Sequence, residues 1–142
     1  MFDRILTVCD GNICRSPTAA AMLRRHRPEK RVTSAGLVGL EGQDMDPVAR
    51  EVAREHGLDC GEHVARKLMG AHCRDAEIIL VMEARQRDAL IKSYPEVSGK
   101  VFLLSHWNGG RNIPDPYRRG KDAFEQVYRL LDKAAEAWAG KL

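Results

Sequence analysis

The chain has 142 residues, 44% of them hydrophobic, and a formal net charge of +3. This length suits one hydrophobic core, so we expect a single domain over residues 1-142. The charge is modest and accompanies no nucleic-acid-binding module, and no apolar run approaches the roughly 20 residues of a membrane-spanning helix. We therefore expect no nucleic-acid partner and no membrane insertion. The start of the chain does not resemble a signal peptide, which favours the cytoplasm, and oligomeric state is unknown.

Apolar runs and helix-forming segments alternate along the chain. This alternation predicts an α/β fold, in which a four-stranded parallel sheet carries helices on both faces. In chain order we expect a strand from Ile5 to Cys9, a helix from Pro17 to His26, a strand from Arg31 to Ala35, a helix from Pro47 to His56, a strand from Ile78 to Met82, a helix from Arg85 to Lys92, a strand from Lys100 to Leu103 and a helix from Asp122 to Ala139.

The last predicted helix has a clear start and a clear apolar face. Asp122 is followed three residues later by Glu125, the spacing of a capping box, so we expect Asp122 to be the N-cap. Apolar residues then recur at helical spacing and predict a face that packs into the core. These residues are Phe124, Val127, Leu130, Leu131 and Trp138.

The segment from Cys9 to Pro17 joins the first predicted strand to the first predicted helix. At such a junction the free N–H groups of the first helical turn and the helix dipole favour a phosphate-sized anion. Gly11 permits a tight curl with positive φ, and Arg15 supplies a planar fork that grips two anion oxygens. We predict a phosphate-binding loop at the carboxyl end of the first strand, formed by Asp10, Gly11, Asn12, Ile13, Cys14 and Arg15.

Cys9 is expected at the floor of this loop, where positive charge favours the thiolate. A thiolate that faces a bound phosphate is a nucleophile directed at phosphorus. From their positions, Ser16 can donate its hydroxyl to the sulfur and Asn12 can hydrogen-bond across the loop. The alternative reading, a buried apolar cysteine with Arg15 as a surface cation, leaves the strand-to-helix context unexplained.

Asp115 is the candidate general acid. Transfer of a phosphoryl group to a thiolate leaves an alkoxide or phenoxide that needs a proton. Proline on both sides of Asp115 restricts the backbone and favours an extended conformation that projects the carboxyl group. Tyr117 can contact an aromatic substrate ring. Taken alone Pro-Asp-Pro is more typical of a simple turn, so this assignment depends on the cysteine loop.

The chain resembles the low-molecular-weight protein tyrosine phosphatase family. The family signature Cys-x-Gly-Asn-x-Cys-Arg-Ser-Pro matches Cys9 to Pro17, and its later Asp-Pro-Tyr matches Asp115 to Tyr117. The resemblance implies that Cys9 attacks phosphotyrosine to form a phosphocysteine, that Arg15 stabilises the equatorial oxygens, and that Asp115 protonates the departing phenol and then activates water. It also implies a supporting hydrogen-bond network of Asn12, Ser16, Ser34 and His63, with no metal or cofactor.

Within the family, Leu40 and the segment from Leu103 to Asn108 resemble bacterial members that act on membrane-bound tyrosine kinases of capsule or exopolysaccharide export. This resemblance implies a phosphotyrosine protein as substrate and such a kinase as a candidate partner. We expect Leu40, Tyr117 and Arg118 to border the substrate cleft. Arg118 adds a cation that attracts acidic residues flanking the phosphotyrosine.

Two acidic residues depart from the usual pattern. Asp10 directly follows the nucleophile, where related sequences carry apolar or small residues, and its charge opposes a bound dianion. We expect its side chain to point outward toward the substrate peptide, and Asp10→Val to lower the Michaelis constant for an aryl phosphate. Glu83 stands where some relatives have aspartate, and we expect this change to matter little.

The remaining cysteines leave other interpretations open. In the resembled family a disulfide between Cys9 and Cys14 protects the nucleophile, but Cys14 can equally pack beneath the loop. Cys60 and Cys73 form no zinc-binding pattern and are expected to be structural. An arsenate reductase of the same fold would need a relay of further cysteines that this pair does not resemble. A non-catalytic phosphate-binding module, or a redox switch of Cys9 and Cys14, remains a further alternative.

Overall fold

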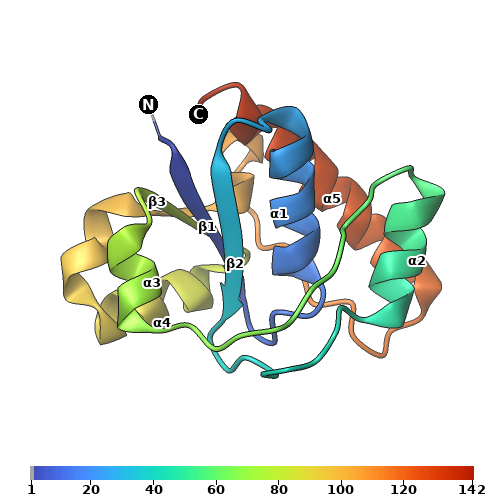
Figure 1. Ribbon diagram of the computed structural model, residues 1–142, viewed down its shortest axis with the longest axis horizontal. Helices are drawn as coiled ribbons and strands as arrows, with labels where there is room; N and C mark the ends of the chain where they lie inside the picture. Colours follow the sequence, from blue (N-terminus) through green and yellow to red (C-terminus); the bar gives the residue numbers. More distant parts are fainter. Residues whose placement is uncertain (1) are drawn as a thin grey trace.

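A computed structural model describes residues 2–142 and contains one parallel β-sheet (Figure 1). Its strands are β1 (Arg4–Cys9), β2 (Arg31–Gly36), β3 (Ile78–Val81) and β4 (Val101–Leu103), in the spatial order β2-β1-β3-β4. Cys9 pairs with Gly36 and Val8 pairs with Val81, so β1 lies in the middle of the sheet. The predicted four-stranded parallel sheet is confirmed.

Helices cover both faces of the sheet, as expected (Figure 1). The helices α1 (Arg15–His26), α2 (Pro47–Glu55) and α5 (Lys121–Ala139) pack on one face, whereas α3 (Gly70–Asp75) and α4 (Ala84–Ser93) pack on the other. Two 3₁₀ helices flank β4, η1 (Pro95–Lys100) and η2 (Leu104–Asn108). Among residues 2–142, no helix is both long and apolar enough to span a bilayer.

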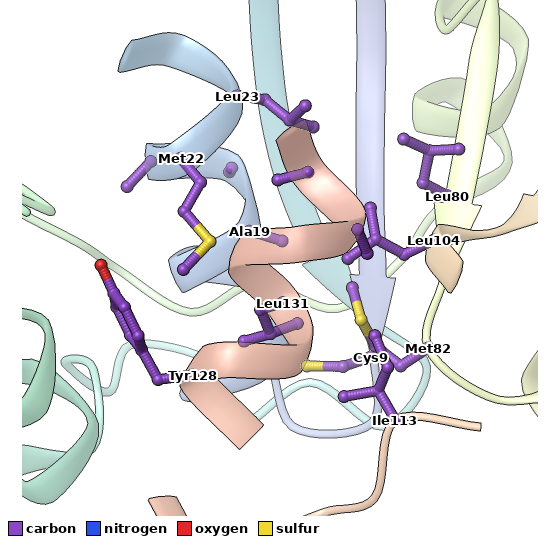
Figure 2. Packing of buried hydrophobic residues seen from close by; sticks show 14 of the residues in the cluster. Cys9, Ala19, Met22, Leu23, Leu80, Met82, Leu104, Ile113, Tyr128 and Leu131 are labelled. Atoms are coloured by element: carbon purple, nitrogen blue, oxygen red, sulfur yellow. The ribbon is translucent and has the colours of Figure 1, made fainter. Parts of the chain in front are cut away.

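Alternating side chains along the strands feed two separate hydrophobic clusters. Ile5 and Cys9 of β1 point into the cluster beneath α1 and α5, while Leu6 and Val8 point into the cluster beneath α3 and α4. Because both faces are covered, most strand residues are buried, and β3 (Ile78–Val81) is apolar along its whole length. Cys9 belongs to the same cluster as Met82 and Ile113, which places the sulfur at the edge of a rigid core (Figure 2).

Several predicted boundaries were wrong at the ends of helices. α1 begins at Arg15 and not at Pro17, so Pro17 lies within the first turn, where a missing N–H is tolerated. α5 begins after Gly120, and Asp122 lies in its first turn, near the positive end of the helix dipole, and not at the N-cap. Leu130 was predicted to face the core but is 45% exposed.

The short helix α3 was not predicted. Its six residues contain a single buried side chain, Cys73, so they show no apolar periodicity. The pattern that revealed the longer helices is therefore missing here.

Candidate active site

The loop between β1 and α1 is held from outside through its carbonyl oxygens. The carbonyls of Cys9, Asp10 and Gly11 accept hydrogen bonds at 2.9–3.0 Å from amides of residues 37–40, and the Ile13 carbonyl accepts one at 2.7 Å from Asp46 N. In a trans peptide the N–H group points opposite to the preceding carbonyl. The amides that follow these carbonyls are therefore turned toward the inside of the loop, the arrangement of an anion-binding nest.

Asn12, and not Gly11, adopts the left-handed conformation in this loop. Its φ is +59°, whereas Gly11 is not among the residues with positive φ. Asparagine tolerates this region better than most residues because its side chain forms local hydrogen bonds. The fully buried Asn12 side chain donates to Ser16 Oγ at 2.8 Å and to Ser34 Oγ at 2.9 Å, and accepts from Arg66 N at 3.0 Å.

Gly36 lets the end of β2 approach the loop. A Cβ atom at this position would lie 2.5 Å from the Asp10 carbonyl oxygen and 2.9 Å from Asn12 N. No side chain fits at these distances, so glycine is required for close packing of the loop on β2.

The Cys9 sulfur is buried and receives hydrogen bonds from Ser16. Ser16 Oγ lies 2.9 Å from Cys9 Sγ, and Ser16 N lies 3.4 Å from it. Because Asn12 donates to the same Ser16 oxygen, the serine hydroxyl hydrogen is free to point to the sulfur. Both Ser16 groups are placed to stabilise negative charge that develops on the sulfur during a reaction.

His63 and Ser34 hydrogen-bond to Asn12 of the same loop. His63 Nε2 lies 2.6 Å from the Asn12 carbonyl oxygen, which only accepts, so this ring nitrogen carries the hydrogen. Arg66 Nε donates to the Ser34 carbonyl oxygen at 2.8 Å. The structure thus brings Asn12, Ser16, Ser34 and His63 together around one loop.

The Arg15 side chain is almost completely buried and is held on one side. Its Nη1 donates to Glu83 Oε2 at 2.5 Å and to the Ile113 carbonyl oxygen at 2.8 Å. Burial by itself lowers the pKa of Arg15, but the negative charges of Cys9 and Glu83 raise it above its ordinary value. Glu83 is the carboxylate partner of this buried cation, a role that the sequence did not indicate.

Asp10 does not extend toward a substrate peptide, which corrects that expectation. Its carboxylate lies against the start of α4, where it accepts hydrogen bonds from Arg85 at 2.5 and 3.1 Å and from Gln86 at 3.0 Å. Burial works to raise the pKa of Asp10, but the hydrogen bonds from Arg85 and Gln86 hold it below its ordinary value. No sequence pattern links Asp10 to residues 85 and 86.

Asp115 and Cys9 line the same cavity, of about 350 Å³. Asp115 Oδ1 accepts from Tyr117 N at 3.0 Å, and its Oδ2 lies 3.9 Å from Arg15 Nη2. The carboxyl group is about half exposed, so it can reach solvent or a substrate oxygen. The full lining is Cys9, Asp10, Gly11, Ile13, Cys14, Arg15, Val38, Leu40, Asp115 and Tyr117.

The predicted cleft residues lie in different places. Leu40 and Tyr117 line the cavity together with Val38 and Ile13, which makes its wall largely apolar. Arg118 does not line the cavity, but its guanidinium carbon lies 5.1 Å from the centre of the Tyr117 ring. It can therefore influence what approaches the mouth of the cavity.

All of the cysteines are free thiols. Burial raises the pKa of the Cys14 thiol well above its ordinary value, and negative charge at Cys9 and Asp46 acts in the same direction. Burial therefore favours the neutral thiol form of Cys14. Within residues 2–142, no group of three His, Cys, Asp or Glu side chains is arranged to hold a metal ion.

Comparison with known proteins identifies the family to which this chain belongs. The family described as low molecular weight phosphotyrosine protein phosphatase matches residues 4–142. The low molecular weight protein-tyrosine-phosphatase Wzb of Salmonella typhimurium is 49% identical over 142 residues, which cover 100% of this chain and 95% of that protein. A probable phosphatase of the same kind, AmsI of Erwinia amylovora, is 44% identical, with 100% and 99% covered.

Solved structures agree with the sequence comparison. Wzb of Vibrio vulnificus in complex with benzylphosphonate superposes with a TM-score of 0.97 at 44% identity, and the match covers 100% of both chains. The predicted resemblance is therefore confirmed. The chain belongs to the low molecular weight phosphotyrosine protein phosphatase family and is a protein-tyrosine phosphatase.

Proposed function

We propose that Cys9, Arg15 and Asp115 carry out phosphotyrosine hydrolysis in two steps. In the first step the Cys9 thiolate attacks phosphorus, the bond from phosphorus to the tyrosyl oxygen breaks, and that oxygen takes a proton from Asp115. In the second step water attacks the phosphocysteine, Asp115 accepts a proton from this water, and Cys9 leaves as thiolate with release of inorganic phosphate. Arg15 Nη2 and the inward-facing loop amides stabilise the charge on the phosphoryl oxygens.

The observation that carries this proposal is the shared cavity of Cys9, Arg15 and Asp115. Arg15 Nη1 is occupied by Glu83 and Ile113, so Nη2 is the end of the fork that remains for an anion. In the part of the chain that the structure describes, the acceptors nearest to Nη2 are distant, at 3.4 Å in Asp10 and 3.9 Å in Asp115. A phosphate oxygen is a stronger partner than either at these distances.

The wall of the cavity supports an aromatic phosphate as substrate. Ile13, Val38, Leu40 and Tyr117 present apolar surface around the phosphate-binding loop, and Val38 and Tyr117 are largely exposed at the rim. An aryl ring buried there gains hydrophobic and ring-stacking energy that a serine side chain does not. The complex of the Vibrio vulnificus relative with benzylphosphonate, which joins an aromatic ring to a phosphonate, supports the same substrate class.

We infer that the physiological substrate is a phosphotyrosine protein and propose a membrane-bound tyrosine kinase of polysaccharide export as candidate. The support is the likeness to the Wzb and AmsI phosphatases. We place the protein in the cytoplasm, because a catalytic thiol persists best in a reducing compartment.

The direct test is hydrolysis of p-nitrophenyl phosphate and of a phosphotyrosine peptide. Cys9→Ser should abolish hydrolysis, and Asp115→Asn should reduce it while keeping an oxygen that accepts from Tyr117 N. Phosphoserine peptide serves as the control substrate and should be hydrolysed far more slowly. Full activity of Cys9→Ser would refute the proposal. Arsenate turnover with thioredoxin would instead support the alternative of an arsenate reductase.

A further inference from the structure

Arg85, at the start of α4, makes a two-pronged contact with the acidic residue beside the nucleophile. Its Nη1 lies 3.1 Å from Asp10 Oδ1 and its Nη2 lies 2.5 Å from Asp10 Oδ2. Nη2 also donates to Glu83 Oε2 at 3.0 Å. One arginine, whose side chain is 59% exposed, therefore neutralises two carboxylates at the edge of the active-site cavity.

The same two carboxylates are also the acidic neighbours of Arg15. Glu83 Oε2 accepts from both Arg15 Nη1 and Arg85 Nη2, and Asp10 Oδ2 is shared between Arg15 Nη2 and Arg85 Nη2. The contact of Asp10 with Arg85 is much shorter than its contact with Arg15, 2.5 Å against 3.4 Å. Asp10 thus binds Arg85 in preference to the donor of Arg15 that faces the phosphate site.

We propose that Arg85 is a positioning residue, which holds the Asp10 carboxylate away from Arg15 and cancels its repulsion of the substrate phosphate. This inference rests on the proposed function, because it assigns Arg85 a part in binding the phosphate of that reaction. Asp10 faces no other cation within bonding distance than Arg85 and Arg15 among residues 2–142. Without Arg85, Arg15 is the cation among residues 2–142 that remains within bonding distance of Asp10.

The neutral neighbour Gln86 cannot replace Arg85. Gln86 Nε2 donates to Asp10 Oδ1 at 3.0 Å, which orients the carboxylate but does not cancel its charge. Gln86 Oε1 already accepts from Met82 N and Glu83 N, so this side chain is fixed at the start of α4. Gln86 contacts only Asp10 Oδ1, so Oδ2 can turn to Arg15 Nη2 when Arg85 is absent.

The test is a double-mutant cycle of Arg85→Ala and Asp10→Asn on the full chain. It measures kcat and KM for p-nitrophenyl phosphate and the binding of inorganic phosphate by calorimetry, at low and high salt. Arg87→Ala, which removes the same charge from the same helix, is the control, because among residues 2–142 the ion-pair partner of Arg87 is the exposed Asp88 alone. Calorimetry measures phosphate affinity for the same variants without catalytic turnover.

We expect Arg85→Ala to raise KM and to weaken phosphate binding roughly tenfold, the size expected for one uncompensated charge close to a dianion. The change in kcat should be smaller, and high salt should reduce the loss because exposed charges are screened. Asp10→Asn should strengthen phosphate binding, and adding it to Arg85→Ala should restore most of the lost affinity.

Three results would overturn the inference. If the double variant binds phosphate as weakly as Arg85→Ala, Arg85 contacts the phosphate or substrate itself. If Asp10→Asn alone is as impaired as Arg85→Ala, the pair only attaches α4 to the loop. If Arg85→Ala behaves like Arg87→Ala, the contact has no effect on the site. The parent protein could prove inactive while the phosphate affinities of the variants change as expected. That result would refute the proposed function and not this inference.

Discussion

Asn12 attaches the phosphate-binding loop to two neighbouring segments, and its replacement by glycine measures what that attachment contributes. The side chain is fully buried and takes part in hydrogen bonds with Ser16, Ser34 and Arg66. Each such bond stabilises the folded state by about 1 kcal/mol, so loss of the set should cost about 3 kcal/mol. Glycine keeps the φ of +59° without strain, which isolates the hydrogen-bond contribution.

Asn12→Ala separates the backbone contribution. Alanine loses the same hydrogen bonds and adds a left-handed strain of roughly 1–2 kcal/mol, partly offset by its lower entropy in the unfolded chain. We therefore expect Asn12→Ala to be about 0.5–1 kcal/mol less stable than Asn12→Gly. Both variants should remain folded, because total stabilities of about 5–15 kcal/mol exceed these losses.

Equilibrium unfolding in urea measures these differences, with the exposed Asn108→Gly as control for the change of residue type. Phosphate affinity, measured by competitive inhibition, should fall in parallel, because the loop amides are no longer held in place. A loss of stability below about 1 kcal/mol for Asn12→Gly would refute the reasoning, since it is less than one average hydrogen bond contributes.

Three further predictions concern the reacting groups and their support. Asp115→Asn should lower kcat by about 10²–10⁴ for phosphotyrosine and by much less for p-nitrophenyl phosphate, a better leaving group, whereas equal losses would contradict a general acid. Iodoacetate at neutral pH should alkylate Cys9 before Cys14, because burial raises the pKa of Cys14 and keeps it a thiol. Peptide mapping that finds both cysteines modified at equal rates would argue against this order of reaction. Glu83→Gln should lower the free energy of unfolding by about 1–2 kcal/mol, because a charged acceptor of buried Arg15 becomes neutral. The same loss in the control Glu96→Gln, at an exposed position, would show the effect to be non-specific.

The sheet and the cysteine loop could be predicted because their signals are local. Buried parallel strands are continuous apolar runs, and the Cys9 to Arg15 segment carries its nucleophile, its turn and its arginine within a few positions. Asp115 is distant in sequence, and it was predicted from the chemical need for an acid and from the family resemblance. The structure places it in the cavity of Cys9.

What the sequence could not predict depends on contacts between distant segments. Glu83 reaches Arg15 and Arg85 reaches Asp10 only because β1 and β3 are neighbours in the sheet, so that the loops after both strands meet. The left-handed conformation was expected at Gly11 but is found at Asn12, whose side chain has hydrogen-bond partners from distant segments, Ser34 and Arg66. Asp10, viewed alone, is a charge that repels phosphate, and its pairing with Arg85 changes that expectation.

The most direct measurement of the central claim is chemical identification of the phosphorylated intermediate. Rapid-quench mixing with a radiolabelled aryl phosphate, followed by peptide mapping under alkaline conditions, should find the label on Cys9. Cys14→Ser should retain the label, and Cys9→Ser should lose it. Label on another residue, or turnover by a parent protein that never carries label on Cys9, would contradict the account.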